Sequence, residues 1–428
     1  MADVEQLRKE NQNLHIAVNE LMILNDLATA ISSIQAVDDI IEQIVIKCIK
    51  YLNVEEGTVS LLDRTGDKQS FHTMIRHTDS SATRLPYRMD SGLKGWMLKH
   101  RKSFFSNDIQ ADDRFQFLSD QTYPFQSILC VPLTVKGELI GYLAVFNKKS
   151  GVFSEDDKRL LSIIGSQSAQ ILENARLLEE EKQLLSLREE LKMAHKIQKK
   201  LLPESAPDFH GFDIEAINIP AKSVGGDYYD FILKSKEKLA FCIGDITGKG
   251  MPAAMLMANL QATFRSQILV DDDCPLCMKR TNKLLFNSTE PTKFATLFFG
   301  ILDMNPARLT YVNAGHDHPF LIRDNVETAE LEATGLLLAV VEETDYEVKQ
   351  VDLKPGDVLL FFTDGITEAM NNDKKEFGLD KLRELAKYHS GETSENIAAK
   401  ILQDVNRHTN GAVQSDDITM IVVKYTGR

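Results

Sequence analysis

The chain has little of what marks several common protein classes. Its 428 residues include five cysteines and one tryptophan, and no long apolar run. An odd, small number of cysteines argues against a disulfide framework, and a membrane helix needs about 20 consecutive apolar residues. The charged start, MADVEQLRKENQ, also lacks the apolar core of a signal peptide. We therefore expect a cytoplasmic protein without a membrane span.

The chain also has fewer positively charged than negatively charged side chains. The chain carries 49 Lys and Arg against 63 Asp and Glu, which gives a net charge of −14. Nucleic acids and anionic membranes are bound through basic patches, so neither is expected as the main partner. An acidic balance does suit a site in which carboxylates hold cations. At this length the chain can form two or three domains.

The run GDITGKG, residues 244–250, is close to a phosphate-binding P-loop but lacks its spacing. A P-loop requires G-x-x-x-x-G-K-[ST]. Here Gly244 and Gly248 are one residue too close, and Lys249 is followed by Gly250. The run joins an apolar strand to an apolar helix, so Asp245, rather than the glycines, becomes the candidate chemical group.

Leucines recur every seven residues in two segments that are predicted to be helical. They are Leu7, Leu14 and Leu21 near the start, and Leu177, Leu184 and Leu191 in the region of residues 176–203. Heptad spacing is typical of coiled coils and predicts a homodimer. The alternatives are a helix docked on its own domain for the first segment and a plain spacer for the second.

Residues 34–175 have a mixed pattern of helices and strands. GTVSLLDR alternates like a strand, SILCVPLTVKGELIGYLAVFNK predicts a hairpin with its turn at Lys136-Gly137, and Ser154 is placed to cap a following helix. This order resembles a GAF domain, a small sensory fold with an antiparallel sheet flanked by helices. The resemblance implies a sensor for a small-molecule or protein signal.

Some GAF domains that bind cyclic nucleotides carry an N-K…F-x-x-x-D-E signature. It is matched here by Asn147, Lys148, Phe153 and Asp157, but Lys158 stands where that signature has Glu. A sensor or dimerisation domain with another ligand, or with none, therefore stays an alternative.

After Pro207 the chain changes to short alternating strands separated by turns. Helices are expected near 252–268, 274–286, 378–388 and 394–408, which predicts an α+β domain of packed sheets with helices outside. Four acidic clusters stand beside its apolar strands or glycines. They are Asp227 with Asp230, Asp245, Asp364 with Glu368, and Asp416 with Asp417.

Carboxylates at sheet edges, without Lys or Arg to pair them, are costly to bury. Several that converge would repel one another unless cations lay between them. Ligands that are all oxygen favour Mg²⁺ or Mn²⁺ over zinc. The clusters therefore predict a centre for divalent ions.

The motifs of this region resemble the SpoIIE/RsbU-type branch of the metal-dependent PP2C serine/threonine phosphatases. In order, they are VGGDYYD, GDITGKGMPAAM, FATLFFGILD, YVNAGHDHP, FFTDGITEA, FG and DDIT, and AHKIQKKLLP resembles the helix that precedes the domain in this branch. The resemblance implies an αββα sandwich with two Mn²⁺ or Mg²⁺ ions at one end. We therefore expect a helix over 1–33, a GAF-like domain over 34–175, a helical linker over 176–203 and a phosphatase domain over 204–428.

The resemblance also assigns roles residue by residue. Asp227 and Asp245 would hold or bridge the two ions, helped by the backbone carbonyl of Ile246. Asp364 and Asp416 would hold the outer faces, and Asp417 would lie behind the ligands or ligate a third ion. Adjacency leaves the choice between Asp416 and Asp417 open, and we prefer Asp416.

Paired ions activate water and neutralise phosphate charge, so no nucleophilic side chain is required. In this branch the substrate is typically a phosphorylated anti-sigma-factor antagonist of the STAS fold, which implies partner switching in bacterial transcription. The pair His316 and His318 lacks further zinc ligands, and His316 is a candidate proton donor to the leaving group. The rival hypothesis is an inactive module that acts by binding a partner. One departure from the family is TGLLLAV, where Leu337 and Ala339 replace Pro and Gly.

Overall fold

The computed structural model describes residues 36–63, 70–77, 91–114 and 125–427, with scattered positions between 6 and 29. It divides into two compact units, Met1–Leu185 and Ser186–Arg428, which are considered separately below. The predicted N-terminal coiled coil over 1–33 lies largely outside the described residues. Among the helices that the structure describes, none combines the length and apolar character that a bilayer crossing requires.

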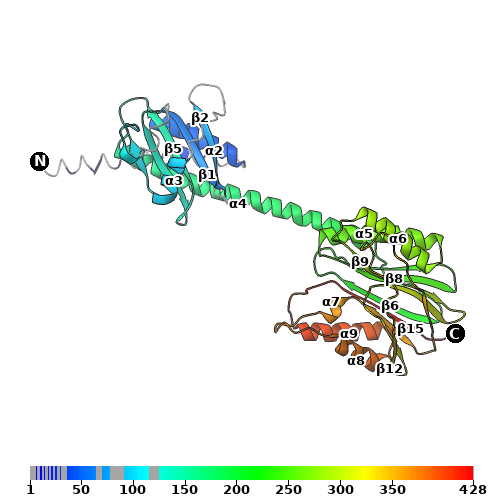
Figure 1. Cartoon of the computed structure of the whole chain (residues 1–428). Helices are drawn as coiled ribbons and strands as arrows, with labels where there is room; N and C mark the ends of the chain where they lie inside the picture. The colour runs from blue at the N-terminus through cyan, green and yellow to red at the C-terminus, as the bar shows by residue number, and fades with distance from the viewer. Residues whose placement is uncertain are drawn as a thin grey trace. The chain divides into compact units, whose positions relative to one another are not determined.

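The first unit contains a five-stranded antiparallel sheet with the strand order β2-β1-β5-β4-β3 (Figure 1). Its elements are α2 (Val37–Leu52), β1 (Val54–Asp63), β2 (Ser70–His77), α3 (Ser91–His100), β3 (Phe104–Ser106), β4 (Ile128–Val135), β5 (Glu138–Lys148) and the start of α4 (Glu155–Lys199).

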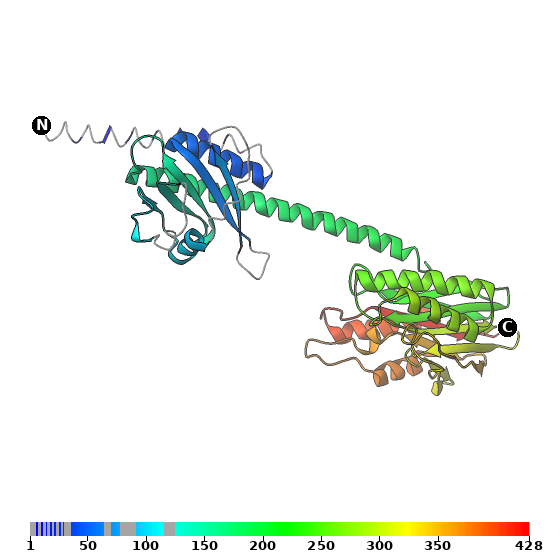
Figure 2. The ribbon, with the colours of Figure 1, turned by 45° about the horizontal axis from the view of Figure 1, so that its top comes forward.

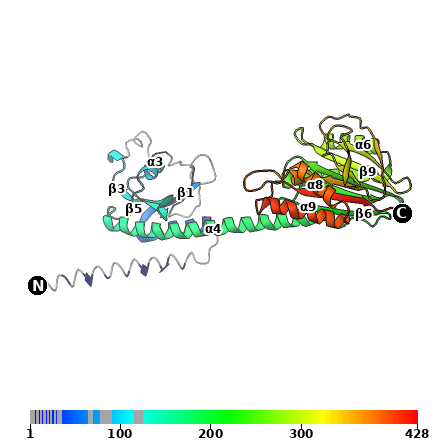
Figure 3. The ribbon, with the colours of Figure 1, turned by 90° about the horizontal axis from the view of Figure 1, so that it is seen from below.

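Helices cover both faces of this sheet. Ile44 of α2 and Leu161 of α4 are buried in one cluster with Val131 of β4. Met97 of α3 is buried in another, with Tyr142 of β5. Figure 3 shows α3 and α4 on opposite sides of the strands. An antiparallel sheet flanked by helices is the arrangement predicted for residues 34–175.

The predicted hairpin and helix start are both confirmed. Lys136 and Gly137, with φ of 50° and 85°, form the tight turn between β4 and β5. The Ser154 hydroxyl accepts a hydrogen bond from the Asp157 N–H at 3.3 Å, and the Asp157 carboxylate accepts one from the Ser154 N–H at 2.9 Å. This reciprocal cap starts α4, a helix of 45 residues that continues without a break into the predicted linker (Figure 3).

The residues that match the cyclic-nucleotide signature make contacts within the first unit, one of which joins the end of β5 to the start of α4. Lys148 forms an ion pair with Asp157, and the ring of Phe153 is buried. The Asn147 side chain accepts a hydrogen bond from the Gln126 N–H at 2.8 Å and donates one to Glu55 at 2.8 Å. These contacts account for the four residues without a ligand.

The second unit is built on two five-stranded sheets, ordered β13-β10-β9-β8-β7 and β12-β11-β14-β15-β6. The elements of the first sheet and its helices are β7 (Tyr228–Leu233), β8 (Lys238–Ile246), α5 (Met251–Val270), α6 (Cys274–Ser288), β9 (Ala295–Asp303), β10 (Arg308–Ala314) and β13 (Lys349–Asp352). Those of the second are β6 (Phe212–Ile219), β11 (Phe320–Arg323), β12 (Val326–Glu330), β14 (Val358–Phe362), α7 (Asp364–Thr367), α8 (Leu379–His389), α9 (Ser394–Thr409) and β15 (Ile418–Tyr425).

The layers follow the predicted αββα order. Helices α5 and α6 lie together over the first sheet, and α8 and α9 lie on the outer side of the second (Figures 1 and 2). Between the sheets, the rings of Phe241 and Phe298 each have their centroids 4.9 Å from the ring of Phe361. The four helices expected from the sequence are α5, α6, α8 and α9.

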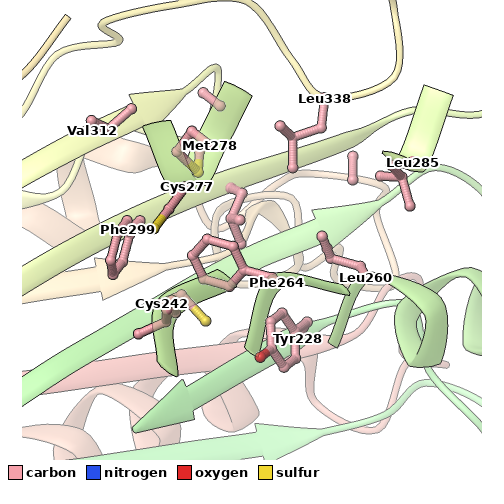
Figure 4. Close-up of a cluster of buried hydrophobic side chains, with 14 of the residues drawn as sticks. Tyr228, Cys242, Leu260, Phe264, Cys277, Met278, Leu285, Phe299, Val312 and Leu338 are labelled. Atoms are coloured by element: carbon pink, nitrogen blue, oxygen red, sulfur yellow. The ribbon is translucent and has the colours of Figure 1, made fainter. Parts of the chain in front are cut away.

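The cluster under α5 and α6 contains two cysteines with C-x-x-C spacing, a spacing that also occurs in zinc and redox sites. Phe264 of α5 meets Phe299 of β9 edge to face, with the ring centroids 5.0 Å apart (Figure 4). Cys274 and Cys277 of α6 are buried in the same cluster, and burial raises the pKa of the Cys277 thiol to about 11. The pair therefore has a packing role rather than a redox role.

Removing one of the central rings tests the sandwich core. We expect Phe361→Ala to lower the free energy of unfolding of the second unit by about 3–5 kcal/mol, because it deletes a buried ring and leaves a cavity. Tyr388→Ala is a matched control, since that ring is 82% exposed. Urea unfolding monitored by far-ultraviolet circular dichroism measures the free energy of unfolding of both variants. Equal stability of the two variants would contradict this packing.

Candidate metal centre

The predicted site aspartates come together at one end of the sandwich. Asp227 directly precedes β7, and Asp245 lies at the end of β8, whose antiparallel pairing sets Tyr228 opposite Gly244. In the other sheet, Asp364 follows β14, and Asp416 and Asp417 precede β15, with Phe362 opposite Met420. Antiparallel pairing places the end of one strand beside the start of its neighbour, so each sheet brings its acids to the same edge.

Asp227 is the most deeply buried of these acids, with 3% of its surface exposed. Its carboxylate accepts hydrogen bonds from the hydroxyls of Thr363, at 2.8 Å, and Thr419, both in the opposite sheet. Burial, with the charge of Asp245 beside it, raises the pKa of Asp227 well above its ordinary value. Asp227 therefore links the two sheets at the site.

The pKa values of Asp245 and Asp364 are also raised by burial and by neighbouring negative charges. Burial raises the pKa of Asp245 to about 6; a hydrogen bond from Asp227 opposes this rise, and the charge of Asp416 adds to it. Burial and the charge of Asp245 raise the pKa of Asp364 to about 7. Burial and neighbouring negative charge thus both disfavour the ionised forms of these two carboxyls, as expected where carboxylates converge.

The backbone of the first acidic motif closes tightly around Asp245 and Ile246. A Cβ placed on Gly226 would lie 3.0 Å from the carbonyl oxygen of Ile246 and 3.7 Å from Asp245 Oδ1. The Ile246 carbonyl predicted as a ligand therefore faces the loop that carries Asp227. A side chain at position 226 would fill this cradle.

Asp416 and Asp417 differ in their partners. Asp417, which is 7% exposed, accepts hydrogen bonds from the backbone N–H groups of Ala221 at 2.7 Å and Gly226 at 2.5 Å. Asp416 forms an ion pair with Lys249, with Nζ 2.7 Å from Oδ2. Asp417 thus holds the loop of residues 221–226 in place, whereas the Asp416 carboxylate contacts one exposed side chain, Lys249, and accepts a hydrogen bond from the neighbouring Asp417 N–H at 2.9 Å.

Two other acids of the four clusters have different surroundings. Asp230 is buried against α5, where it pairs with Arg265 at 2.5 Å and accepts a hydrogen bond from the Tyr228 hydroxyl at 3.1 Å. The structure does not bring it to the centre. Glu368 does lie close enough to Asp364 for its charge to raise the pKa of that residue.

The suggestion that His316 donates a proton to the leaving group is wrong. His316 is 2% exposed, and burial lowers its pKa to about 3, so the ring is neutral at physiological pH. Its Nδ1 lies 3.0 Å from the hydroxyl of Thr296, which accepts a hydrogen bond from the Asp245 N–H at 3.1 Å. His316 is therefore a positioning residue, behind Thr296 and Asp245.

A cavity of about 280 Å³ opens beside this cluster and is lined in part by His316, Asp317 and Glu330. The charge of Asp317 contributes to the raised pKa of Asp364, which places the cavity next to the acids. His318 also lines the cavity, with Nδ1 3.5 Å from a Glu330 carboxylate oxygen. His316 and His318 thus have separate partners, Thr296 and Glu330.

Several contacts at the site were not predicted. The hydroxyls of Thr296, Thr363 and Thr419 fix the acids, and Gln198 fixes the first motif from the end of α4. The Gln198 side chain donates to the Gly225 carbonyl at 2.7 Å and accepts from the Gly225 N–H at 3.0 Å. The motif AHKIQKKLLP contained this residue, but its partner lies 27 positions away.

Comparison with known proteins identifies the family of each part of the chain. Residues 235–426 match the family described as Stage II sporulation protein E (SpoIIE), and residues 35–173 match the GAF domain. Phosphoserine phosphatase RsbU of Bacillus subtilis is 30% identical over 245 residues, which are 56% of this chain and 70% of RsbU. The chain belongs to the SpoIIE family of PP2C-type phosphatases.

Two further relatives extend the comparison. Protein IcfG of Synechocystis is 32% identical over 261 residues, covering 55% of this chain but only 41% of IcfG. The solved SiaA-PP2C domain of Pseudomonas aeruginosa superposes with a TM-score of 0.51 at 20% identity, covering 56% of this chain and 98% of that domain. The last likeness shows the fold of the SpoIIE-family domain.

Phosphatases of this family are metal-dependent. Within the described part of the chain, no group of three or more His, Cys, Asp or Glu side chains is arranged to hold an ion as it stands. The donors of the SpoIIE-family domain nevertheless fit hard divalent cations, because they are all oxygens and because a cation would lower the raised pKa values of Asp245 and Asp364. An ion that binds here would displace contacts that the acids make within the protein, such as the ion pair between Asp416 and Lys249.

The raised pKa values predict how metal binding depends on pH. At pH 5.5 the carboxyls of Asp245 and Asp364, with pKa values of about 6 and about 7, are largely protonated, and a divalent ion must displace those protons. We expect Mn²⁺ affinity, measured by calorimetry, to be at least about tenfold weaker at pH 5.5 than at pH 7.5.

The same groups set the stability of the ion-free SpoIIE-family domain. Because their pKa values are raised on folding, the stability they contribute is present at low pH and is lost as the pH rises through about 7. Mn²⁺ should therefore raise the melting temperature more at pH 7.5 than at pH 5.5, with NaCl of equal ionic strength as the control. An equal rise in melting temperature at pH 5.5 and pH 7.5 would contradict the raised pKa values assigned to Asp245 and Asp364.

Proposed function

We propose that the second unit is a Mn²⁺- or Mg²⁺-dependent phosphatase that hydrolyses phosphoserine and phosphothreonine in proteins. The observation that carries the proposal is the convergence of Asp227, Asp245, Asp364 and Asp416 from both sheets onto one end of the sandwich. Two ions per site, or three if Asp417 ligates one, would relieve the repulsion among these acids.

The chain's own residues prepare the site. Asp227 and Asp245 would hold the ions between the sheets, with the Ile246 carbonyl beside them, and Asp364 and Asp416 would hold the outer faces. When bound, a pair of divalent ions supplies an activated water and neutralises charge on the phosphoryl group. Thr363 and Thr419 orient Asp227, and Asp417 orients the 221–226 loop through its amides.

The substrate we propose is a phosphorylated anti-sigma-factor antagonist of the STAS fold, in bacterial partner switching. RsbU, a relative of 30% identity, is a phosphoserine phosphatase. The chain spans less than half of IcfG and 70% of RsbU, so activity, substrate and partners rest on this proposal. The inactive-module alternative is not favoured, because every acid assigned to the ions is present.

Regulation would come from the GAF domain, through a small-molecule or protein signal and the linker of residues 176–203. Helix α4 carries that linker, and Gln198 near its end is hydrogen-bonded to Gly225, two residues before Asp227. A change at this end of α4 would therefore reach the first acidic motif directly.

The proposed activity is tested with Asp245→Asn. We expect the full chain to release phosphate from a phosphorylated STAS-domain protein in Mn²⁺, and the variant to lose at least about 100-fold in kcat/KM, because an ion ligand loses its charge. Asp380→Asn, whose side chain is 96% exposed, should keep full activity. Undiminished activity of Asp245→Asn, or full wild-type activity in excess EDTA, would overturn the proposal.

We also propose that the chain forms a homodimer through α4. Leu177, Leu184 and Leu187 are each about half exposed on this helix, at 49%, 57% and 52%. Leu184 and Leu187 stand three residues apart, the spacing of one coiled-coil seam.

Placing charge in that seam tests the dimer. We expect Leu184→Glu with Leu187→Glu to shift the chain from dimer to monomer in sedimentation equilibrium, because two carboxylates would be buried without partners. Gln183→Glu, which adds charge to the same exposed helix at a different position, should leave the mass unchanged. A wild-type chain that sediments as a monomer would refute the proposal.

A further inference from the structure

Three lysine side chains surround the loop that joins β8 to α5. Lys249 lies within this loop, and its Nζ donates to the Ser415 carbonyl at 2.6 Å in addition to its ion pair with Asp416. A Cβ placed on Gly248 would lie 3.0 Å from Lys293 Nζ, and one placed on Gly250 would lie 3.7 Å from Lys222 Cδ. We call Lys222, Lys249 and Lys293 the lysine rim.

The rim is a local concentration of positive charge on an acidic chain, whose net charge is −14. In the part of the chain that the structure describes, Lys222 and Lys293 form no ion pair, and Lys222 is exposed. The loop holds Lys249 in place through Gly248 and Gly250, whose φ angles of 100° and 77° disfavour residues with a Cβ. The backbone is therefore shaped to present this ammonium to the mouth of the acidic cluster.

The partner of Lys249 is the informative feature. Asp416 is the acid proposed to hold the outer face of an ion, yet its Oδ2 is occupied by the Lys249 ammonium at 2.7 Å. An ammonium and a divalent ion cannot share one carboxylate oxygen without repelling each other. The other oxygen, Oδ1, accepts a hydrogen bond from the Asp417 N–H at 2.9 Å, so an ion that binds Asp416 through Oδ2 would release Lys249 from this contact.

Asp364 and Asp417 also lie close enough for their charges to act on Lys249. Once bound ions offset those charges, the dianionic phosphoryl group of a substrate is a partner of suitable charge for the released Lys249. Lys222 and Lys293, on the neighbouring sides of the same loop, would add two further donors. Several ammonium groups around one phosphate are a recurrent mode of anion binding, in which lysines act as point charges.

We propose that Lys249 is an internal counter-ion of Asp416 that gives way to the metal and then, with Lys222 and Lys293, binds the phosphoryl group of the substrate. This proposal rests on the proposed phosphatase function, since it needs both the ions and a phosphorylated substrate. It predicts opposite effects of one substitution on two affinities, which loss of folding or simple damage to the site would not produce.

The test uses the full chain and calorimetry at low ionic strength, where exposed charges are least screened. Lys249→Met should bind Mn²⁺ about three- to fivefold more tightly than the wild type, because the competing ammonium is gone. In saturating Mn²⁺ the same variant should bind inorganic phosphate about three- to fivefold more weakly. Lys249→Arg keeps the charge and should stay near wild type in both titrations.

Lys236→Met is the matched control, because Lys236 is exposed and lies at the β7–β8 turn, the far end of these strands. It should change neither affinity, and melting curves show whether each variant is folded. Unchanged or weaker Mn²⁺ binding by Lys249→Met would overturn the counter-ion role, and unchanged phosphate binding would overturn the phosphate role. A wild-type chain that binds no Mn²⁺ would instead overturn the proposed function, so the two failures can be told apart.

Discussion

The second unit depends on one electrostatic constraint: several carboxylates are brought together where two sheets meet, away from most of the solvent. Burial alone disfavours each charge, and the neighbouring acids disfavour it further. Hydroxyls, backbone amides and one ammonium compensate for this cost, as the surroundings of Asp227, Asp417 and Asp416 illustrate. Each of these groups offsets part of the negative charge, and the cluster can still bind a divalent cation.

The same contacts join the layers of the sandwich. Asp227 belongs to one sheet and its two threonine partners to the other, so the seam is closed by hydrogen bonds at the site and by aromatic rings deeper inside. Within the first sheet, Thr296 of β9 supports the backbone of Asp245, and His316 in turn contacts the Thr296 hydroxyl. The ligands of the proposed ions are thus parts of the fold's framework rather than side chains on free loops, which limits how far they can move.

Local features could be predicted well from the sequence. The helices of the second unit, the Lys136-Gly137 turn and the Ser154 cap depend on residues a few positions apart, and all are present. The order of the motifs resembles that of a known family, and this resemblance predicted that the acids lie in one site. Partners far apart in the chain were not predictable: Lys249 meets Asp416, and Arg265 meets Asp230, only after the strands have paired. For Asp230 the alternation of β7 held a usable signal, since Tyr228 and Ile232 on the same face lie under α5.

The closeness of the backbone around the acids also limits what evolution can change there. At Gly365, directly after Asp364, an added Cβ would stand 1.9 Å from the Asp417 carbonyl oxygen, and that neighbour is main chain rather than a side chain that can turn away. A substitution at this position would therefore force the backbone to move, although Gly365 has no side chain that could take part in the chemistry. If proteins descended from this chain strictly retain this glycine, the reason would be the space taken up by the neighbouring peptide group, not a role in catalysis.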